Sequence, residues 1–297
     1  MSRILIVGGD MRNVCLAKIL CSEGYDVGVC AIDKKFFKDH DICMHSSLKD
    51  AASQAELVLL PVVCSSDNIV INTPLHDDCF YLGDIYENVS AATIVCGGKM
   101  NLSEFEKRGL LAIDYAKRDD FAALNAVPTA EGAIEAVMKH LPVTIFSSNA
   151  VVTGFGKCAK VLAMLLKSMG AGVTVCARKQ GDLALAEALG LKSTKITSMH
   201  NALSRADMVF NTVPDIVFGT AEFFAMKKGC ILADLASAPG GADKNALCNA
   251  DIKYMFLPGL PGKYSPVSAA RIIWKIAINI IGECGKDAST WNLRERG

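Results

Sequence analysis

The chain has 297 residues, of which 51% are hydrophobic and 21% charged, a composition typical of globular proteins. Its 31 basic and 31 acidic side chains give a formal net charge of zero, so no long-range field attracts nucleic acid or an anionic membrane. This length exceeds what one ordinary hydrophobic core needs, and it predicts two domains.

The apolar runs of the sequence are short. The run at 4–7 is too short for the core of a signal peptide, and Lys275 interrupts the apolar stretch at 272–281. Many of the 12 cysteines lie within apolar runs and no two have Cys-x-x-Cys spacing, which favours buried reduced thiols over disulfides or a metal site. We therefore expect a cytoplasmic protein with no metal centre.

Short apolar runs alternate with longer amphipathic stretches in the first part of the chain. They predict strands at 4–7, 27–32, 57–61, 93–96 and 110–114, with helices at 11–23 and 102–108. Alternation of this kind is typical of a mostly parallel sheet with helices on both faces.

A connecting helix is expected next, at 128–140, with Pro128 as the breaker before it and Thr129 as its N-cap. A second alternating series then predicts strands at 149–153, 172–176, 208–211, 230–234 and 254–257, and helices at 157–169, 181–189 and 268–283.

These patterns predict an α/β protein with two doubly wound parallel-sheet domains, and the glycine turn Gly154-Phe-Gly156 after a strand makes the second a Rossmann NAD(P)-binding fold. The expected division is a substrate-side α/β domain at 1–126, a connecting helix at 127–145, the Rossmann domain at 146–262 and a C-terminal segment at 263–297. The helix of that last segment is expected to pack back on the first domain.

A glycine turn gives the strongest indication of function. An apolar strand enters Gly154-Phe-Gly156, and an amphipathic helix leaves it. Gly154 permits a tight turn, Gly156 lets a pyrophosphate approach the backbone, and Ala159 allows close packing of helix on strand. The sequence therefore predicts a dinucleotide site, with a structural glycine turn as the alternative.

The ends of the neighbouring strands are expected to complete this site. Arg178 follows the second strand, where an acidic residue would favour NAD, so we expect the guanidinium to pair with the 2′-phosphate of NADP. The predicted cofactor-binding residues are Gly154, Phe155, Gly156, Lys157, Ala177, Arg178, Thr212, Val213, Pro214, Leu235, Ala236 and Ser237. A second glycine turn, at Gly8-Gly9, lacks the dinucleotide spacing, but its amides and Arg12 are suited to an anion.

Several short motifs run in order along nearly the whole chain. The most specific are Asp234-Leu-Ala-Ser237 and Leu257-Pro-Gly-Leu-Pro-Gly262. The others are Val7-Gly-Gly-Asp10 with Arg12, Arg118-Asp-Asp120, Val127-Pro-Thr-Ala-Glu-Gly132, Gly154-Phe-Gly156, Ala177-Arg178, Asn211-Thr-Val-Pro214 and Pro239-Gly-Gly241. Together they resemble the A subunits of dipicolinate synthase, and the layout more distantly resembles D-2-hydroxyacid dehydrogenases.

The resemblance implies an oxidoreductase that uses NADP, with NAD as the alternative, to form dipicolinate (pyridine-2,6-dicarboxylate) from a dihydrodipicolinate-type precursor. It implies a flavoprotein-like B subunit, a homo-oligomer and a role in the mother cell of a sporulating bacterium. The sequence departs from the family after Pro266, where Val267-Ser-Ala-Ala270 replaces Lys-Thr-Ala-Gly. A cation available to relatives is therefore absent unless Lys263 or Arg271 replaces it.

A dicarboxylate substrate calls for cations, hydroxyl groups or helix N-termini as ligands. The candidates are Arg12, Arg118, Thr129 and Lys263, which we expect between the domains. Glu131 and Asp120 are candidates for a general base.

Two alternatives stay open. One is an amino-acid or 2-hydroxyacid dehydrogenase, although no histidine follows His200, where the histidine–carboxylate pair of such enzymes is expected. The other is a non-catalytic nucleotide-binding regulatory subunit, since no acid–base residue is evident.

Overall fold

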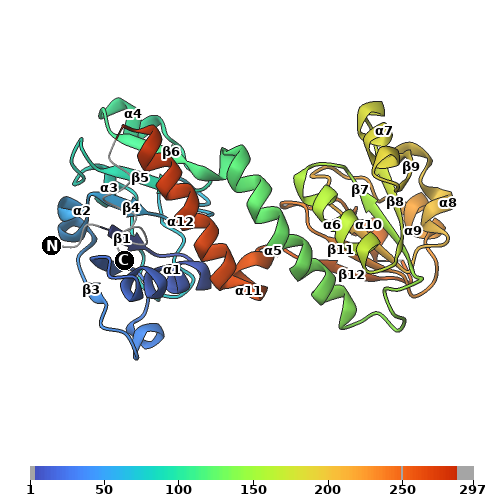
Figure 1. Cartoon of the computed structure of the whole chain (residues 1–297), viewed down its shortest axis with the longest axis horizontal. Helices are drawn as coiled ribbons and strands as arrows, with labels where there is room; N and C mark the ends of the chain where they lie inside the picture. The colour runs from blue at the N-terminus through green and yellow to red at the C-terminus, as the bar shows by residue number, and fades with distance from the viewer. Residues whose placement is uncertain (1–3, 249, 286–297) are drawn as a thin grey trace. The chain divides into compact units, whose positions relative to one another are not determined.

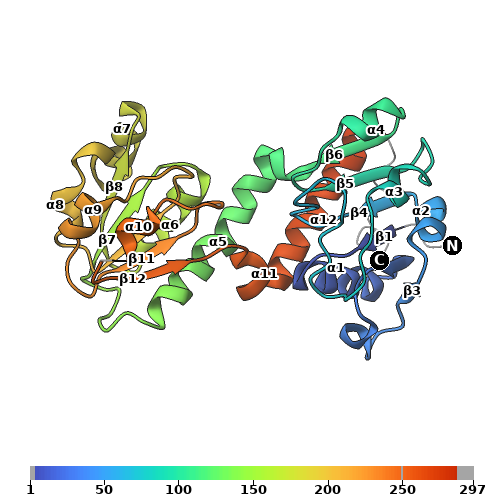
Figure 2. The same ribbon diagram turned by 180° about the vertical axis from the view of Figure 1, so that it is seen from behind.

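The computed structural model describes residues 4–248 and 250–285, which fall into two compact units (Figures 1 and 2). Unit 1 comprises Met1–Leu124 and Ser265–Gly297, and unit 2 comprises Asn125–Tyr264. Each unit contains a six-stranded parallel sheet with helices on both faces, so the predicted fold class is confirmed.

The sheet of unit 1 has the order β3-β2-β1-β4-β5-β6. Its strands are β1 Ile4–Val7, β2 Val27–Cys30, β3 Cys43–His45, β4 Leu57–Leu59, β5 Ile94–Gly97 and β6 Leu111–Asp114. Its helices are α1 Met11–Ser22, α2 Leu48–Gln54, α3 Gly83–Tyr86, α4 Ser103–Lys107 and α12 Pro266–Glu283, with 3-10 turns at η1 Lys34–Phe37 and η2 Tyr115–Lys117.

Both faces of this sheet are buried, which is why its central strands read as continuous apolar runs. On one face Ile4 and Ile6 pack against α1 and α12, and on the other Leu5 and Val7 pack with α2, α3 and α4. Helix α12 lies beside α1, so the expected return of the last helix to the first sheet is confirmed (Figure 1).

The sheet of unit 2 repeats the same topology in the order β12-β11-β10-β7-β8-β9. Its strands are β7 Asn149–Thr153, β8 Gly172–Ala177, β9 Lys192–Lys195, β10 Met208–Asn211, β11 Ile231–Asp234 and β12 Lys253–Phe256. Its helices are α6 Lys157–Ser168, α7 Gln180–Ala188, α8 His200–Leu203, α9 Thr220–Ala225, α10 Lys244–Leu247 and α11 Leu260–Tyr264, with the 3-10 turn η3 Ile196–Ser198.

The two faces of this second sheet are covered differently. Val152 and Val173 belong to a core that includes α6, α7 and the C-terminal half of α5 (Asp119–Met138). Val151 and Val209 pack on the opposite face, against the short helices α8 and α9 and the loops beside them. The order of the strands reverses between β7 and β10. At such a point a doubly wound sheet binds ligands, at the carboxyl ends of its strands.

The expected start of the connecting helix is wrong. Helix α5 begins at Asp119, and Pro128 lies inside it. The helix continues through the proline because its apolar face stays buried, as Ala126 and Ala130, two positions before and after Pro128, are both buried. Acidic residues in the first turn, Asp119 and Asp120, favour the earlier start because they oppose the positive end of the helix dipole.

Two strands were not predicted, because neither contains an apolar run. β3 and β9 are edge strands, and the exposed or half-buried side chains of β9 read Lys-Ser-Thr-Lys. The other predicted elements are present, with ends that differ by a residue or two. No helix in the part of the chain that the structure describes is long and apolar enough to cross a bilayer.

Candidate functional site

The turn between β7 and α6 requires glycine at its first position. Gly154 has φ +85°, and a Cβ placed there would lie 2.6 Å from Oγ1 of Thr212. The Gly154 amide donates to the Cys176 carbonyl at 2.8 Å, which ties the turn to the end of β8. The protein itself therefore excludes a side chain at Gly154.

At Gly156, the second glycine of the turn, the surrounding protein does not require a glycine. A Cβ at Gly156 would meet no protein atom within 4 Å, and φ −74° with ψ −172° is open to any residue. Gly156 is also the N-cap of α6, and a glycine has no side chain that could accept a hydrogen bond from the first turn of that helix. The free space and the uncapped amides form a cradle for an anion, which a side chain would fill.

A cavity of about 200 Å³ lies beside this turn. Of the predicted cofactor-binding residues it brings together Gly154, Phe155, Gly156, Ala177, Arg178, Thr212, Val213 and Pro214. It also includes three residues that the sequence analysis missed, Lys179, Asp182 and Ile196. Lys157 begins α6, and 235–237 follow β11; these residues do not line the cavity.

A buried polar network holds the strand ends next to the cavity. Thr153 donates from Oγ1 to Oδ1 of Asn211 at 2.6 Å, and Asn211 donates from Nδ2 to Oδ1 of Asp234 at 2.8 Å. The three side chains are fully buried and come from β7, β10 and β11. Oδ1 of Asn211 also accepts from the Val213 amide, so the network fixes the loop that lines the cavity.

Arg178 stands at the rim of the cavity and is 69% exposed. It pairs with Asp215, whose Oδ2 lies 3.8 Å from Nη1 and which is itself 66% exposed. A pair this exposed and this long is weak, so the guanidinium can exchange Asp215 for another anion at little cost. The position of Asp215 directly after Pro214 was visible in the sequence, but its pairing with Arg178 was not.

The expectation that the amides of the Gly8-Gly9 turn in unit 1 bind an anion is wrong, because they donate to the carbonyls of Cys30 and Asn72, each at 2.9 Å. Oδ1 of Asp10 accepts from the Arg12 amide at 3.0 Å, and the carboxylate also accepts from Nε and Nη2 of Arg12 at 2.9 and 2.8 Å. These bonds hold the pKa of Asp10 below its ordinary value, although burial opposes the shift. Arg12 is only 8% exposed, so Asp10 fixes the direction in which its guanidinium can bind.

Arg118 is engaged by two carboxylates of unit 1. Its Nε and Nη2 donate to Asp120, and its Nη1 and Nη2 donate to Glu283 at the end of α12, at 2.6 to 3.0 Å. The hydrogen bond from Arg118 lowers the pKa of Asp120 to about 2. A carboxylate with such a pKa is a poor base near neutral pH, so these contacts disfavour both the substrate role of Arg118 and the catalytic role of Asp120.

The other candidates lie on helices of unit 2. Thr129 is inside α5, where its hydroxyl donates to the Asn125 carbonyl at 2.7 Å, so the expected N-cap with free amides after it is wrong. Glu131 is exposed and lines an apolar groove with Met138 and Leu165, not the cavity at Gly154. Lys263 is exposed on the short helix α11.

Sheet order, glycine turn and uncapped helix together define the class: a two-domain α/β protein whose second unit is a Rossmann NAD(P)-binding domain of the dehydrogenase type. Comparisons with known proteins agree. Residues 144–224 match the family model of the NADPH-binding domain of acetohydroxy acid isomeroreductase. D-lactate dehydrogenase from Escherichia coli shares the fold at 14% identity and a TM-score of 0.57, with 96% of this chain and 98% of that one covered.

The particular resemblance is to the A subunit of dipicolinate synthase, and it extends over nearly the whole chain. Residues 3–116 match the family model of the N-terminal domain of that subunit. The Bacillus subtilis protein is 26% identical over 290 residues, 95% of this chain and 96% of that one. The crystal structure of the Bacillus halodurans protein superposes with a TM-score of 0.83 at 25% identity, covering 94% of this chain and 97% of that one. The resemblance read from the motifs is confirmed.

Proposed function

We propose that this chain is the NADP-binding subunit of an oxidoreductase that forms dipicolinate. The single observation that carries the proposal is Gly156, where open space meets the uncapped N-terminus of α6 inside the cavity. Its residues fit a dinucleotide: the turn at 154–156 would hold the pyrophosphate, and Arg178 would hold the 2′-phosphate. A bound NADP supplies a nicotinamide ring that accepts hydride.

The cavity of about 200 Å³ is smaller than a typical site for a whole ligand, about 300 Å³ or more. It therefore would enclose only the part of the cofactor nearest the turn. Leu235, Ala236 and Ser237 follow β11, and we propose that they continue the site toward the nicotinamide. Asp234 supports this loop, because its Oδ1 accepts from the Ala236 amide at 3.2 Å.

The proposed reaction is the loss of a hydride and a proton from a dihydrodipicolinate-type ring, which becomes pyridine-2,6-dicarboxylate. Aromatisation favours this loss, so the residues mainly need to orient the ring and exclude water. We propose Arg12 as a cation that binds a carboxylate of the substrate, with Lys263 as a second candidate for that role. Support comes from the Asp10 pair that orients Arg12, and from the resemblance to dipicolinate synthase.

The relatives are named as one of the subunits of their enzyme, which supports a partner chain, and we propose that this partner is a flavoprotein-like B subunit. The test uses the purified chain, with and without that partner, mixed with NADP and freshly generated 4-hydroxytetrahydrodipicolinate, which loses water to give the dihydrodipicolinate ring. Reduced cofactor and a pyridine ultraviolet band from the chain alone are the expected result. Turnover of 2-hydroxyacids or amino acids, or tight cofactor binding without turnover in either mixture, contradicts the proposal.

A further inference from the structure

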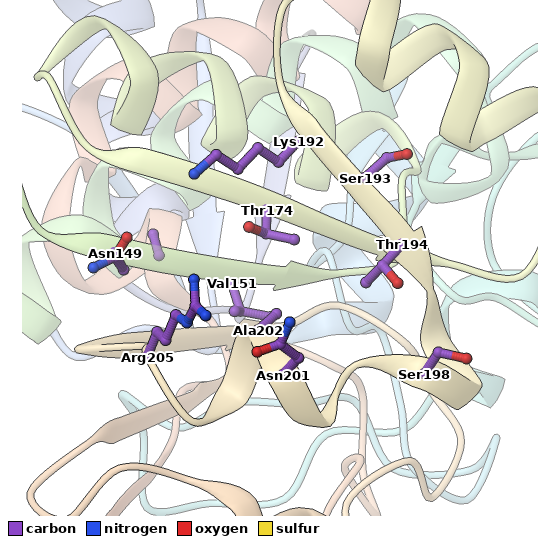
Figure 3. Close-up of a pocket in the computed structure, with 11 residues that line it drawn as sticks. Asn149, Val151, Thr174, Lys192, Ser193, Thr194, Ser198, Asn201, Ala202 and Arg205 are labelled. Atoms are coloured by element: carbon purple, nitrogen blue, oxygen red, sulfur yellow. The ribbon is translucent and has the colours of Figure 1, made fainter.

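A second cavity in unit 2, of about 350 Å³, lies away from the dinucleotide turn. It opens on the sheet face that carries Val151, over β7, β8 and β9, and its polar lining includes Asn149, Thr174, Lys192, Thr194, Asn201 and Arg205 (Figure 3). It shares no lining residue with the cavity at Gly154–Gly156.

The cavity has a topological cause. The connection from β9 to β10 holds only the 3-10 turn η3 and the four-residue helix α8, so no long helix covers β8 and β9 on this side. Strand β8 reflects the difference between its faces. Val173 and Val175 are buried in the core with α6 and α7, while Thr174 between them lines the cavity.

Two cations, Lys192 and Arg205, line this cavity. The acid at its Asn149 end is Asp207, whose carboxylate accepts from the Asn149 amide at 2.9 Å. In the described part of the chain neither Lys192 nor Arg205 has an ion-pair partner, whereas Lys227 nearby is bound to Asp207 at 2.6 Å. Two uncompensated positive charges over one hollow raise the local concentration of anions.

The arrangement of polar groups distinguishes between anions. In Figure 3 the head groups of Lys192 and Arg205 lie toward the end of the cavity that holds Asn149. The hydroxyl groups of Thr194 and Ser198 lie toward the other end, with Asn201 between, whereas the Ser193 hydroxyl donates to Oε1 of Glu187 in α7 at 2.7 Å. A dicarboxylate would need a cation at each end, but a sugar phosphate carries its charge at one end and hydroxyl groups along the rest.

We propose that this cavity is a second ligand site, which binds a small sugar phosphate. The fork of Arg205 and the ammonium of Lys192 hold the phosphate, and the threonine, serine and asparagine side chains bond the sugar hydroxyls. The site is separate from the proposed cofactor site, so a ligand there regulates the domain rather than reacts in it.

The test is calorimetric titration of the full chain with ribose 5-phosphate, ribose and succinate, each up to about 10 mM, a range that detects millimolar affinity. We expect saturable binding of ribose 5-phosphate alone, at least about tenfold weaker in a Lys192→Gln/Arg205→Gln variant. A Lys195→Gln/Lys228→Gln variant loses the same charge from exposed positions outside the cavity and should bind as the wild type does.

The same titration in Gly156→Val separates this site from the cofactor site, since that change fills only the dinucleotide turn. Retained binding supports the second site whether or not NADP binds anywhere. Absent binding in the wild type, equal loss in both double variants, loss in Gly156→Val, or succinate binding as tightly as ribose 5-phosphate would overturn the proposal.

Discussion

Asn211 donates from Nδ2 to Oδ1 of Asp234 across the ends of β10 and β11, at 2.8 Å and with both side chains fully buried. Within the described residues, the groups that stabilise the Asp234 charge are neutral donors: Asn211, the amides of Ala236 and Gly241, and the Tyr254 hydroxyl. The pKa of Tyr254 is raised, first by burial and then by the Asp234 charge, so the hydroxyl keeps its proton and remains a donor.

Replacing Asp234 should therefore destabilise the chain strongly. Asp234→Ala removes the acceptor of the buried Gly241 amide and of one N–H of Asn211, whose Nδ2 keeps only its bond to the Val213 carbonyl. We expect a loss of about 3 kcal/mol or more in the free energy of unfolding. Urea denaturation followed by circular dichroism measures it. Asp251→Ala is the control, because Asp251 is 79% exposed in its pair with Lys228 and should cost less than about 1 kcal/mol. Similar midpoints for the two variants would contradict the assigned role.

The two glycines of the dinucleotide turn give a sharper pair of variants. Gly154→Ala places a Cβ against Thr212 at φ +85°, so we expect it to destabilise the fold by about 2 kcal/mol. In Gly156→Val the Cβ meets no protein atom within 4 Å, and the loss of an N-cap glycine should change the free energy of unfolding by no more than about 1 kcal/mol. The NADP affinity of this variant should nevertheless fall at least about 100-fold, because the side chain occupies the proposed pyrophosphate position. Calorimetry checks this, and unchanged affinity would remove the site.

The cofactor turn was predictable because everything that defines it is local. Strand, glycines and helix follow one another within 149–168, and the apolar periodicity marks both flanks. The pairing of Arg118 with Glu283 was not predictable, since the two residues are 165 positions apart and meet only through the packing of α12. The prediction of Thr129 as an N-cap is wrong for a related reason. A proline usually marks the start of a helix, but α5 continues through Pro128 because the apolar face of the helix is buried there.

The preference between NADP and NAD should depend on Arg178 and Asp215. Arg178→Asp should weaken NADP binding by about 10- to 100-fold, because a charge-assisted bond to the 2′-phosphate is replaced by repulsion, and should weaken NAD much less. Asp215→Asn frees Arg178 from an exposed pair and should strengthen NADP binding by up to about fivefold. Titrations of both cofactors measure the ratio, with Lys228→Asp as a distant control. An unchanged ratio in Arg178→Asp would show that its guanidinium does not touch the phosphate.

The Asp120–Arg118–Glu283 cluster should make stability depend on pH in acid. The pKa of Asp120 is about 2, below its ordinary 3.8, and that of Glu283 is also lowered, both mainly by hydrogen bonds from Arg118. A depressed pKa means that the folded state favours the carboxylate, so this contribution is complete above about pH 5 and is lost as the pH falls toward 2. Asp120→Asn should therefore lower the urea midpoint at pH 6 and have a smaller effect at pH 3.

Two further measurements separate this structural role from catalysis. At about 1 M salt the difference between wild type and Asp120→Asn at pH 6 should shrink, because the Asp120 side chain is 34% exposed and its pair is screened. In the dipicolinate assay, a structural pair predicts that kcat at pH 7 stays within about threefold of the wild type. A fall in kcat of about 100-fold or more with an unchanged urea midpoint would instead assign the general base to Asp120. The ion pair with Arg118 requires an effect on stability, whereas proton abstraction requires an effect on the rate.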